Sequence, residues 1–136
     1  MSSVPTACFW YCTSLTSFNF GANLTTLGSS AFNNCTSLAG SVNLQYVTSI
    51  GTWCFSGCSG ITSVTFSSNL TSIGNAAFWG CSGLTGAISV PASVTSVGRC
   101  AFRATKITSL TFLGDSTEIT PGYWSTNDNR GFRTVR

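Results

Sequence analysis

The sequence predicts a mostly β solenoid of about five stacked coils with a period of 23–24 residues. Three observations predict it: a cysteine column, a phenylalanine column and a repeated alternation of apolar and polar residues. The cysteines Cys12, Cys35, Cys58 and Cys81 are each 23 residues apart, and the next equivalent position, Thr105, lies 24 further on. Self-similarity at a fixed period of this length is the signature of a repeat architecture, in which each unit stacks on its neighbours.

The cysteine column belongs to a motif of the form (A/C)-F-x-x-C. Its copies read CFWYC, AFNNC, CFSGC, AFWGC and AFRAT, and the phenylalanine column is Phe9, Phe32, Phe55, Phe78 and Phe102. We expect each copy to form a short, tight helical turn whose phenylalanine and cysteine face the interior of the coil.

A second motif follows each cysteine and predicts a β-strand. The copies are LTSFNF, LAGSVNL, ITSVTF, LTGAISV and ITSLTF. Near its end each alternates apolar and polar residues, as expected of a strand with one buried face. The second and fourth copies are one residue longer, which a β-bulge would absorb.

A third motif predicts a second, shorter strand that ends at a glycine. It reads NLTTLG, YVTSIG, NLTSIG and SVTSVG, and its glycines are Gly28, Gly51, Gly74 and Gly98. A glycine at the end of a β-rich run is typical of a corner that needs positive φ. Equivalent strands of successive coils are expected to pair about 4.8 Å apart.

Charge is nearly absent from the body of the chain. No Asp, Glu, Lys or Arg occurs from Met1 to Gly98, and all nine charged residues lie in the last 38, for a net charge of +3. Nucleic-acid readers usually show denser Lys and Arg clustering, so a nucleic-acid partner is not expected. No apolar run approaches a membrane span, and the opening residues lack the regions of a signal peptide.

The composition argues against catalysis. Histidine is absent, and the carboxylates are Asp115, Glu118 and Asp128, so the repeats lack a general acid or base. No phosphate-binding or dinucleotide fingerprint is present. The pairs Cys8/Cys12 and Cys54/Cys58 lie two coils apart, about 10 Å, too far for one tetrahedral zinc site. We therefore expect no enzyme activity, metal or cofactor.

The seven cysteines allow more than one interpretation. Free thiols that behave as small buried apolar groups are favoured. Disulfides within the column are compatible with distance, although parallel Cβ directions do not suit the dihedral that the bond needs. Cys100 lies off the column and is the candidate free or intermolecular thiol.

Three N-x-S/T sequons begin at Asn23, Asn34 and Asn69. In a secreted eukaryotic chain they would be candidate glycosylation sites. The alternative, which we favour, is that asparagine serves the turn at these positions.

With these motifs, the chain resembles the BspA-type leucine-rich repeat of bacterial and protist cell-surface proteins, most clearly between Ile61 and Leu84. The resemblance covers about residues 4–112 and implies a leucine-rich-repeat solenoid, with residues 113–136 as a polar, charged tail or cap. It also implies an extracellular or cell-surface location and a role in adhesion, protein binding or structure, without catalytic residues.

The solenoid is expected to end in half coils, and unpaired strand edges are templates for another chain. Head-to-tail self-assembly into an extracellular filament is the leading hypothesis. The predicted assembly interface is Phe9, Trp10, Tyr11, Leu110, Phe112, Tyr123, Trp124 and Phe132. The alternatives are a capping tail, or a fragment of a longer array that acts as an adhesin. Such an adhesin would bind a host or matrix protein, with Trp10, Trp53 and Trp79 as contact residues.

Overall fold

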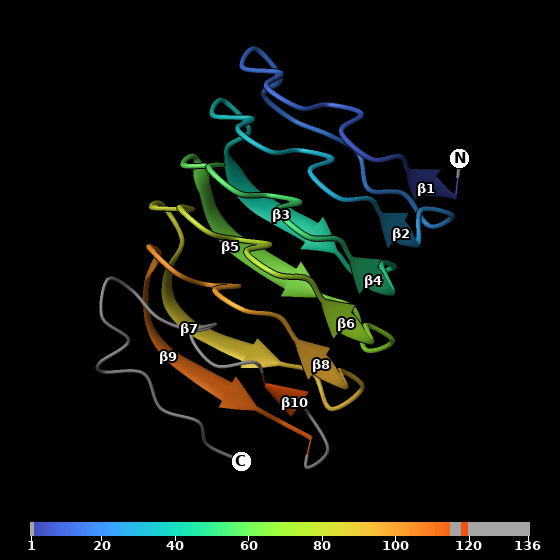
Figure 1. The fold of residues 1–136 in the computed structure, drawn as a ribbon, viewed down its shortest axis with the longest axis vertical. Coiled ribbons are helices and arrows are strands. Elements are labelled where there is room, and N and C mark those ends of the chain that lie inside the picture. The colour runs from blue at the N-terminus through green and yellow to red at the C-terminus, as the bar shows by residue number, and fades with distance from the viewer. Residues whose placement is uncertain (1, 115–117, 120–136) are drawn as a thin grey trace.

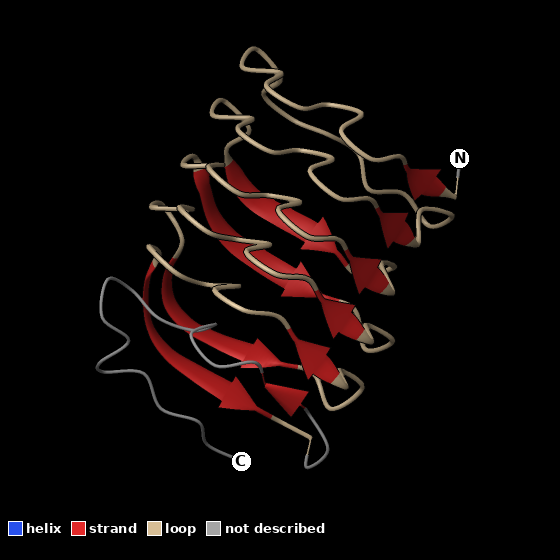
Figure 2. Ribbon diagram, viewed as in Figure 1, coloured by secondary structure: helices blue, strands red, loops and turns tan. Residues whose placement is uncertain are grey.

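The computed structural model describes residues 2–114 and 118–119. Successive coils stack along one axis, and no helix occurs in the described part of the chain (Figures 1 and 2). The short strands are β1 (Ser3–Val4), β2 (Thr26–Leu27), β4 (Ser49–Ile50), β6 (Ser72–Ile73), β8 (Ser96–Val97) and β10 (Glu118–Ile119). The longer strands are β3 (Gly40–Leu44), β5 (Ile61–Phe66), β7 (Thr85–Val90) and β9 (Lys106–Phe112).

The short strands form one parallel sheet with the order β1-β2-β4-β6-β8-β10. Each strand pairs with the equivalent strand of the next coil, so that Leu27 lies opposite Ile50, and Ile50 opposite Ile73. This in-register stacking confirms the predicted solenoid and its second, shorter strand.

The longer strands lie along another side of the stack, where β3 pairs with β5 and β7 with β9 (Figure 1). Register shifts occur between Gly40 and Ser41 and between Gly86 and Ala87. These are the two coils with one extra residue, so the predicted bulges are confirmed. In the first coil, LTSFNF (residues 15–20) is not a strand. A single backbone hydrogen bond joins this described segment to the second coil, from the Ala39 N–H to the Thr16 carbonyl at 3.4 Å.

The phenylalanine- and cysteine-bearing segments are successive turns, and the expected helical turns are wrong. We call residues 6–11, 29–34, 52–57, 75–80 and 99–104 the turn segments. Within the second, Ala31 and Asn33 donate to carbonyls three residues back, whereas Ser30, Phe32 and Asn34 donate to the next coil. Two left-handed residues four apart, Ser30 (φ 56°) and Asn34 (φ 62°), break a helix. Alternate amides therefore hold the segment to its neighbour as a strand would.

The glycine column has a different cause from the one expected. None of Gly28, Gly51, Gly74 and Gly98 has a positive φ. Instead, a Cβ on Gly74 would lie 2.5 Å from the Thr52 nitrogen, and one on Gly98 would lie 2.4 Å from the Asn75 nitrogen. Glycine is required there because the backbones of neighbouring coils approach too closely for any side chain.

The core consists of columns that run the length of the stack. Ring centroids of successive phenylalanines are 5.3–5.4 Å apart, and the planes of Phe32 and Phe55 differ by only 3°. Leu27, Ile50, Ile73 and Val97 form a second buried column. Each coil thus buries its apolar residues against the next coil, as the stacking predicts.

Polar side chains satisfy the backbone between coils without charge. The hydroxyls of Thr48, Thr71 and Thr95 each donate to the carbonyl of the threonine one coil earlier, at 3.1, 2.9 and 3.2 Å. This ladder lies directly before β4, β6 and β8. It explains how an uncharged body rich in Ser and Thr meets its hydrogen-bond requirements.

Candidate binding surface

The turn segments combine a constant backbone with variable outward residues. The left-handed positions recur in every coil at Ala7, Ser30, Trp53, Ala76 and Cys100. A second column, three residues later, holds Trp10, Asn33, Ser56, Trp79 and Arg103. The phenylalanine between these columns never changes. The two columns therefore vary while the phenylalanine is constant, and they hold the exposed Trp10, Trp53 and Trp79 as well as the buried Ser56 and Ala76. We call this side of the stack the turn face.

Trp53 and Trp79 lie against each other on the turn face. Their ring centroids are 4.9 Å apart with an interplanar angle of 36°, and the residues remain 38% and 36% exposed. The two tryptophans belong to different sequence columns, and the sequence did not predict the pair. Their separation of 26 residues is one period plus three. The Cys58 thiol donates to the Phe32 carbonyl over the same separation, so contacts between residues 26 apart recur in the stack, but no pattern in the sequence indicates them.

Two open hollows flank the tryptophan pair. One, of about 280 Å³, is lined by Ser56, Gly57 and Gly80 together with both rings. The other, of about 260 Å³, is lined by both rings and by Thr52, Asn75, Ala76, Arg99 and Cys100. The pair therefore offers aromatic surface with polar groups on both sides.

The cysteine column is structural. All seven cysteines lie within the described residues and are free. The thiols of Cys35, Cys58 and Cys81 each donate to the carbonyl of the phenylalanine 26 residues earlier, at 3.0 Å. Burial raises the pKa of Cys58 to about 12, and it raises the pKa of Cys54 and Cys81 as well. Thiols that hold their protons in this way are poor nucleophiles.

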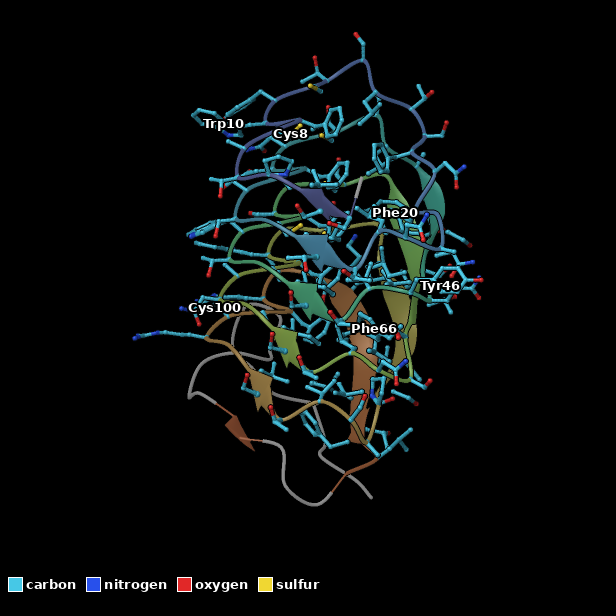
Figure 3. The ribbon with its side chains drawn as sticks, turned by 90° about the vertical axis from the view of Figure 1, so that its right-hand side faces the viewer. Cys8, Trp10, Phe20, Tyr46, Phe66 and Cys100 are labelled. Carbon is cyan, nitrogen blue, oxygen red and sulfur yellow. The ribbon has the colours of Figure 1, made fainter. Side chains whose placement is uncertain are left out.

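The five described residues of the predicted assembly interface lie in the first coil and in β9. Trp10 and Tyr11 are exposed on the turn face of the first coil, and Phe9 is half-buried against Phe32. Figure 3 shows Trp10 on the opposite side of the stack from Phe20, Tyr46 and Phe66. Leu110 and Phe112 are buried in β9. Tyr123, Trp124 and Phe132 lie outside the described residues, so this interface stays a prediction.

The candidate modification sites lie in different surroundings. Cys100, half-buried with φ 59°, lines the hollow beside Trp53 and Trp79. Asn23 and Asn69 are exposed. Asn34 is half-buried, and its amide donates to Asn33 Oδ1 at 2.7 Å. Glycosylation at these three residues stays a prediction, and the packing favours Asn23 and Asn69.

Metal-binding groups do not cluster in the described residues. Among residues 2–114 and 118–119, no three His, Cys, Asp or Glu side chains gather as metal ligands. The described residues also contain no helix long and apolar enough to cross a membrane.

The repeat architecture and the sequence both have known relatives. Residues 2–129 match the BspA type leucine rich repeat region in six copies, and the chain belongs to this family. A leucine rich cell surface protein from Faecalibacterium prausnitzii is similar at 30% identity and TM-score 0.76, over 85% of this chain and 30% of that one. A leucine-rich repeat protein from Bacteroides ovatus has the same fold, at 22% identity and TM-score 0.72, over 100% of this chain and 46% of that one.

The chain spans less than half the length of either of these proteins. No curated protein matches it. The family and the fold are thus shown. What the coils bind has to be inferred from the residues on their surface.

Proposed function

We propose that this chain is a non-catalytic repeat module of a cell-surface protein and that it binds a host or matrix protein through the turn face. The observation that carries the proposal is the pair of variable columns on a constant backbone. Three exposed tryptophans lie in these columns, Trp10, Trp53 and Trp79, and the exposed Tyr11 follows Trp10. Aromatic side chains on a rigid scaffold dominate the energy of protein interfaces. The similarity to a cell surface protein supports the location.

The test is binding of the full chain to immobilised laminin and collagen, measured by surface plasmon resonance. Each tryptophan can be exchanged for a residue that another coil already has at the same position: Trp10→Asn, Trp53→Ala or Trp79→Ser. We expect at least one exchange to weaken binding about tenfold, or roughly 1.4 kcal/mol. Binding that survives all three exchanges together would move the interface away from the turn face.

Head-to-tail assembly has less support. Neither the described coils nor the similar proteins favour a filament, and Leu110 and Phe112 are buried within the chain. Self-assembly therefore stays a prediction, and hydrogen exchange at two protein concentrations tests it.

A further inference from the structure

We propose that the Trp53–Trp79 pair and the two hollows beside it form a binding site for the pyranose rings of an uncharged glycan. This role goes beyond the binding of a protein partner and does not depend on it. It concerns the third, fourth and fifth coils, whose turn segments line the two hollows, rather than the whole turn face.

Trp53 is not needed by the fold. Its φ of 61° is in the left-handed region, which a bulky residue rarely adopts. The equivalent positions hold Ala7 and Ala76 with φ of 56° and 54°, so a small residue serves the turn equally well. The left-handed φ belongs to the turn in every coil, so what is unusual at position 53 is the bulky side chain, whose ring packs on Trp79.

The pair is held in place by the backbone of both coils. The Trp53 N–H donates to the Asn75 carbonyl at 2.8 Å, and the Gly57 N–H donates to the Trp79 carbonyl at 2.7 Å. These bonds fix the two backbones relative to each other, and the two rings already pack together at a centroid distance of 4.9 Å. Order that exists before a ligand arrives lowers the entropic cost of binding.

The first hollow exists because two glycines replace larger residues. Gly57 and Gly80 stand where the first two coils have Tyr11 and Asn34. At these positions φ is 76° and 78°, close to the 57° and 62° of Tyr11 and Asn34. The backbone is thus shared and only the side chains are missing, which opens space beside both rings.

The second hollow supplies the polar groups. Thr52 and Asn75 line it, and Arg99 is the charged residue on its wall. Asn75 Oδ1 accepts the Arg99 backbone N–H at 2.7 Å, which fixes the carboxamide. A few fixed polar groups beside apolar surface are what orients a ligand in a site.

These features fit a neutral sugar better than other ligands. The C–H faces of a pyranose are apolar and carry slightly positive hydrogens, which suit the negative face of an indole. Its hydroxyls donate to and accept from side chains such as Thr52 and Asn75. An apolar peptide would leave these polar groups without partners. A cationic ligand would meet Arg99 and no acidic residue on the walls of either hollow.

The experiment measures binding of neutral oligosaccharides to the full chain by calorimetry and tryptophan fluorescence. The probes are cellohexaose, laminarihexaose, mannohexaose and xylohexaose, with a heparin oligosaccharide and a proline-rich peptide as comparators. We expect saturable binding of at least one neutral probe, weakened about tenfold or more by Trp53→Ala and by Trp79→Ser.

Gly80→Asn places a side chain in the first hollow and leaves both tryptophans in the sequence. Asparagine tolerates positive φ, and a Cβ at Gly80 would meet only the Gly57 backbone at 3.6 Å or beyond. We expect this variant to fold and to lose affinity about as much as the tryptophan variants. Tyr46→Ser is the matched control, because Tyr46 is an exposed aromatic residue on the opposite side of the stack (Figure 3). It should bind normally.

Cys100 gives an independent readout, since it lines the second hollow. A bound oligosaccharide should slow alkylation of Cys100, while exposed Cys8 in the first coil reacts at an unchanged rate. Three results would overturn the proposal: no neutral probe binds at millimolar concentration, binding is unaffected by the variants at Trp53, Trp79 and Gly80, or only the heparin oligosaccharide or the peptide binds.

Discussion

At the scale of single residues, the glycine column shows how close packing between coils restricts side-chain choice. We expect Gly74→Ala to destabilise the chain by about 1–3 kcal/mol or more, because the new methyl group would overlap the backbone of Gly51 and Thr52. Gly21→Ala is the control, since a Cβ there meets nothing within 4 Å. Urea unfolding measures both, and equal free energies of unfolding would show that the coils can separate at little cost.

The buried cysteines predict a loss of stability at alkaline pH. In the unfolded chain these thiols ionise near their ordinary pKa of 9.0, whereas the folded pKa of Cys58 is about 12. Below pH 9 both states hold the proton and stability does not change. Between pH 9 and pH 12 only the unfolded state releases it, so stability falls by about 1.4 kcal/mol per pH unit for each such thiol.

Comparison of variants isolates this effect from other groups that titrate in the same range. Cys58→Thr places in the third coil the residue that the fifth coil has at Thr105. Because the variant lacks one thiol that ionises only in the unfolded state, its free energy of unfolding should fall less steeply with pH, by the contribution of about one proton. Urea unfolding under reducing conditions from pH 8 to about pH 11.5 gives the free energy of unfolding of both proteins, and their slopes should differ by about 1.4 kcal/mol per pH unit. Parallel curves for the two proteins would contradict the prediction.

At the scale of elements, the stacked phenylalanines predict that position along the stack decides the cost of a cavity. Phe55 is fully buried between Phe32 and Phe78, and Phe55→Ala should cost about 3–5 kcal/mol. Phe9 is half-buried and, within the phenylalanine column, stacks only on Phe32. Phe9→Ala should therefore lower the free energy of unfolding clearly less than Phe55→Ala. Thermal and urea unfolding of both variants test this order, which a reversal would refute.

The bulge in β7 requires a left-handed backbone conformation at Gly86. Gly86 has φ 80°, and a Cβ there would meet nothing within 4 Å. Gly86→Ala should therefore lose about 1–2 kcal/mol through backbone strain alone. Gly86→Asn should lose less, because asparagine enters the left-handed region more readily. If alanine and asparagine behave alike in urea unfolding, the cost arises from something other than φ.

The sequence predicted the elements that can be recognised from a single column of equivalent residues in successive coils. The period, both strand types and the bulges are visible because Phe, Cys and the extra residue recur in register. The helical turns were wrong because the pattern A-F-x-x-C records burial but not φ, and the left-handed residues include Ala76 and Trp53. The Trp53–Trp79 pair was not predicted for a similar reason: a contact over 26 residues joins two different columns, and neither column alone indicates it.

At the scale of the whole molecule, the stack is quasi-one-dimensional, so each coil is only as stable as its neighbours make it. The segment 15–20 of the first coil has one backbone hydrogen bond to the second coil, whereas β3 and β5 pair from Gly40/Ile61 to Leu44/Phe66. We expect amide hydrogens of residues 15–20 to exchange much faster than those of β5, through local opening rather than global unfolding. Uniform protection in hydrogen-exchange mass spectrometry would show that all coils unfold together.

The same measurement at two protein concentrations tests head-to-tail assembly. Association through the first coil would cover Phe9, Trp10 and Tyr11 and would supply hydrogen-bond partners to residues 15–20, so protection there would rise with concentration. Because Leu110 and Phe112 are already buried within the chain, we expect protection to be independent of concentration. A concentration-dependent rise confined to the first coil and to β9 would instead establish the filament. An unchanged pattern would contradict head-to-tail assembly.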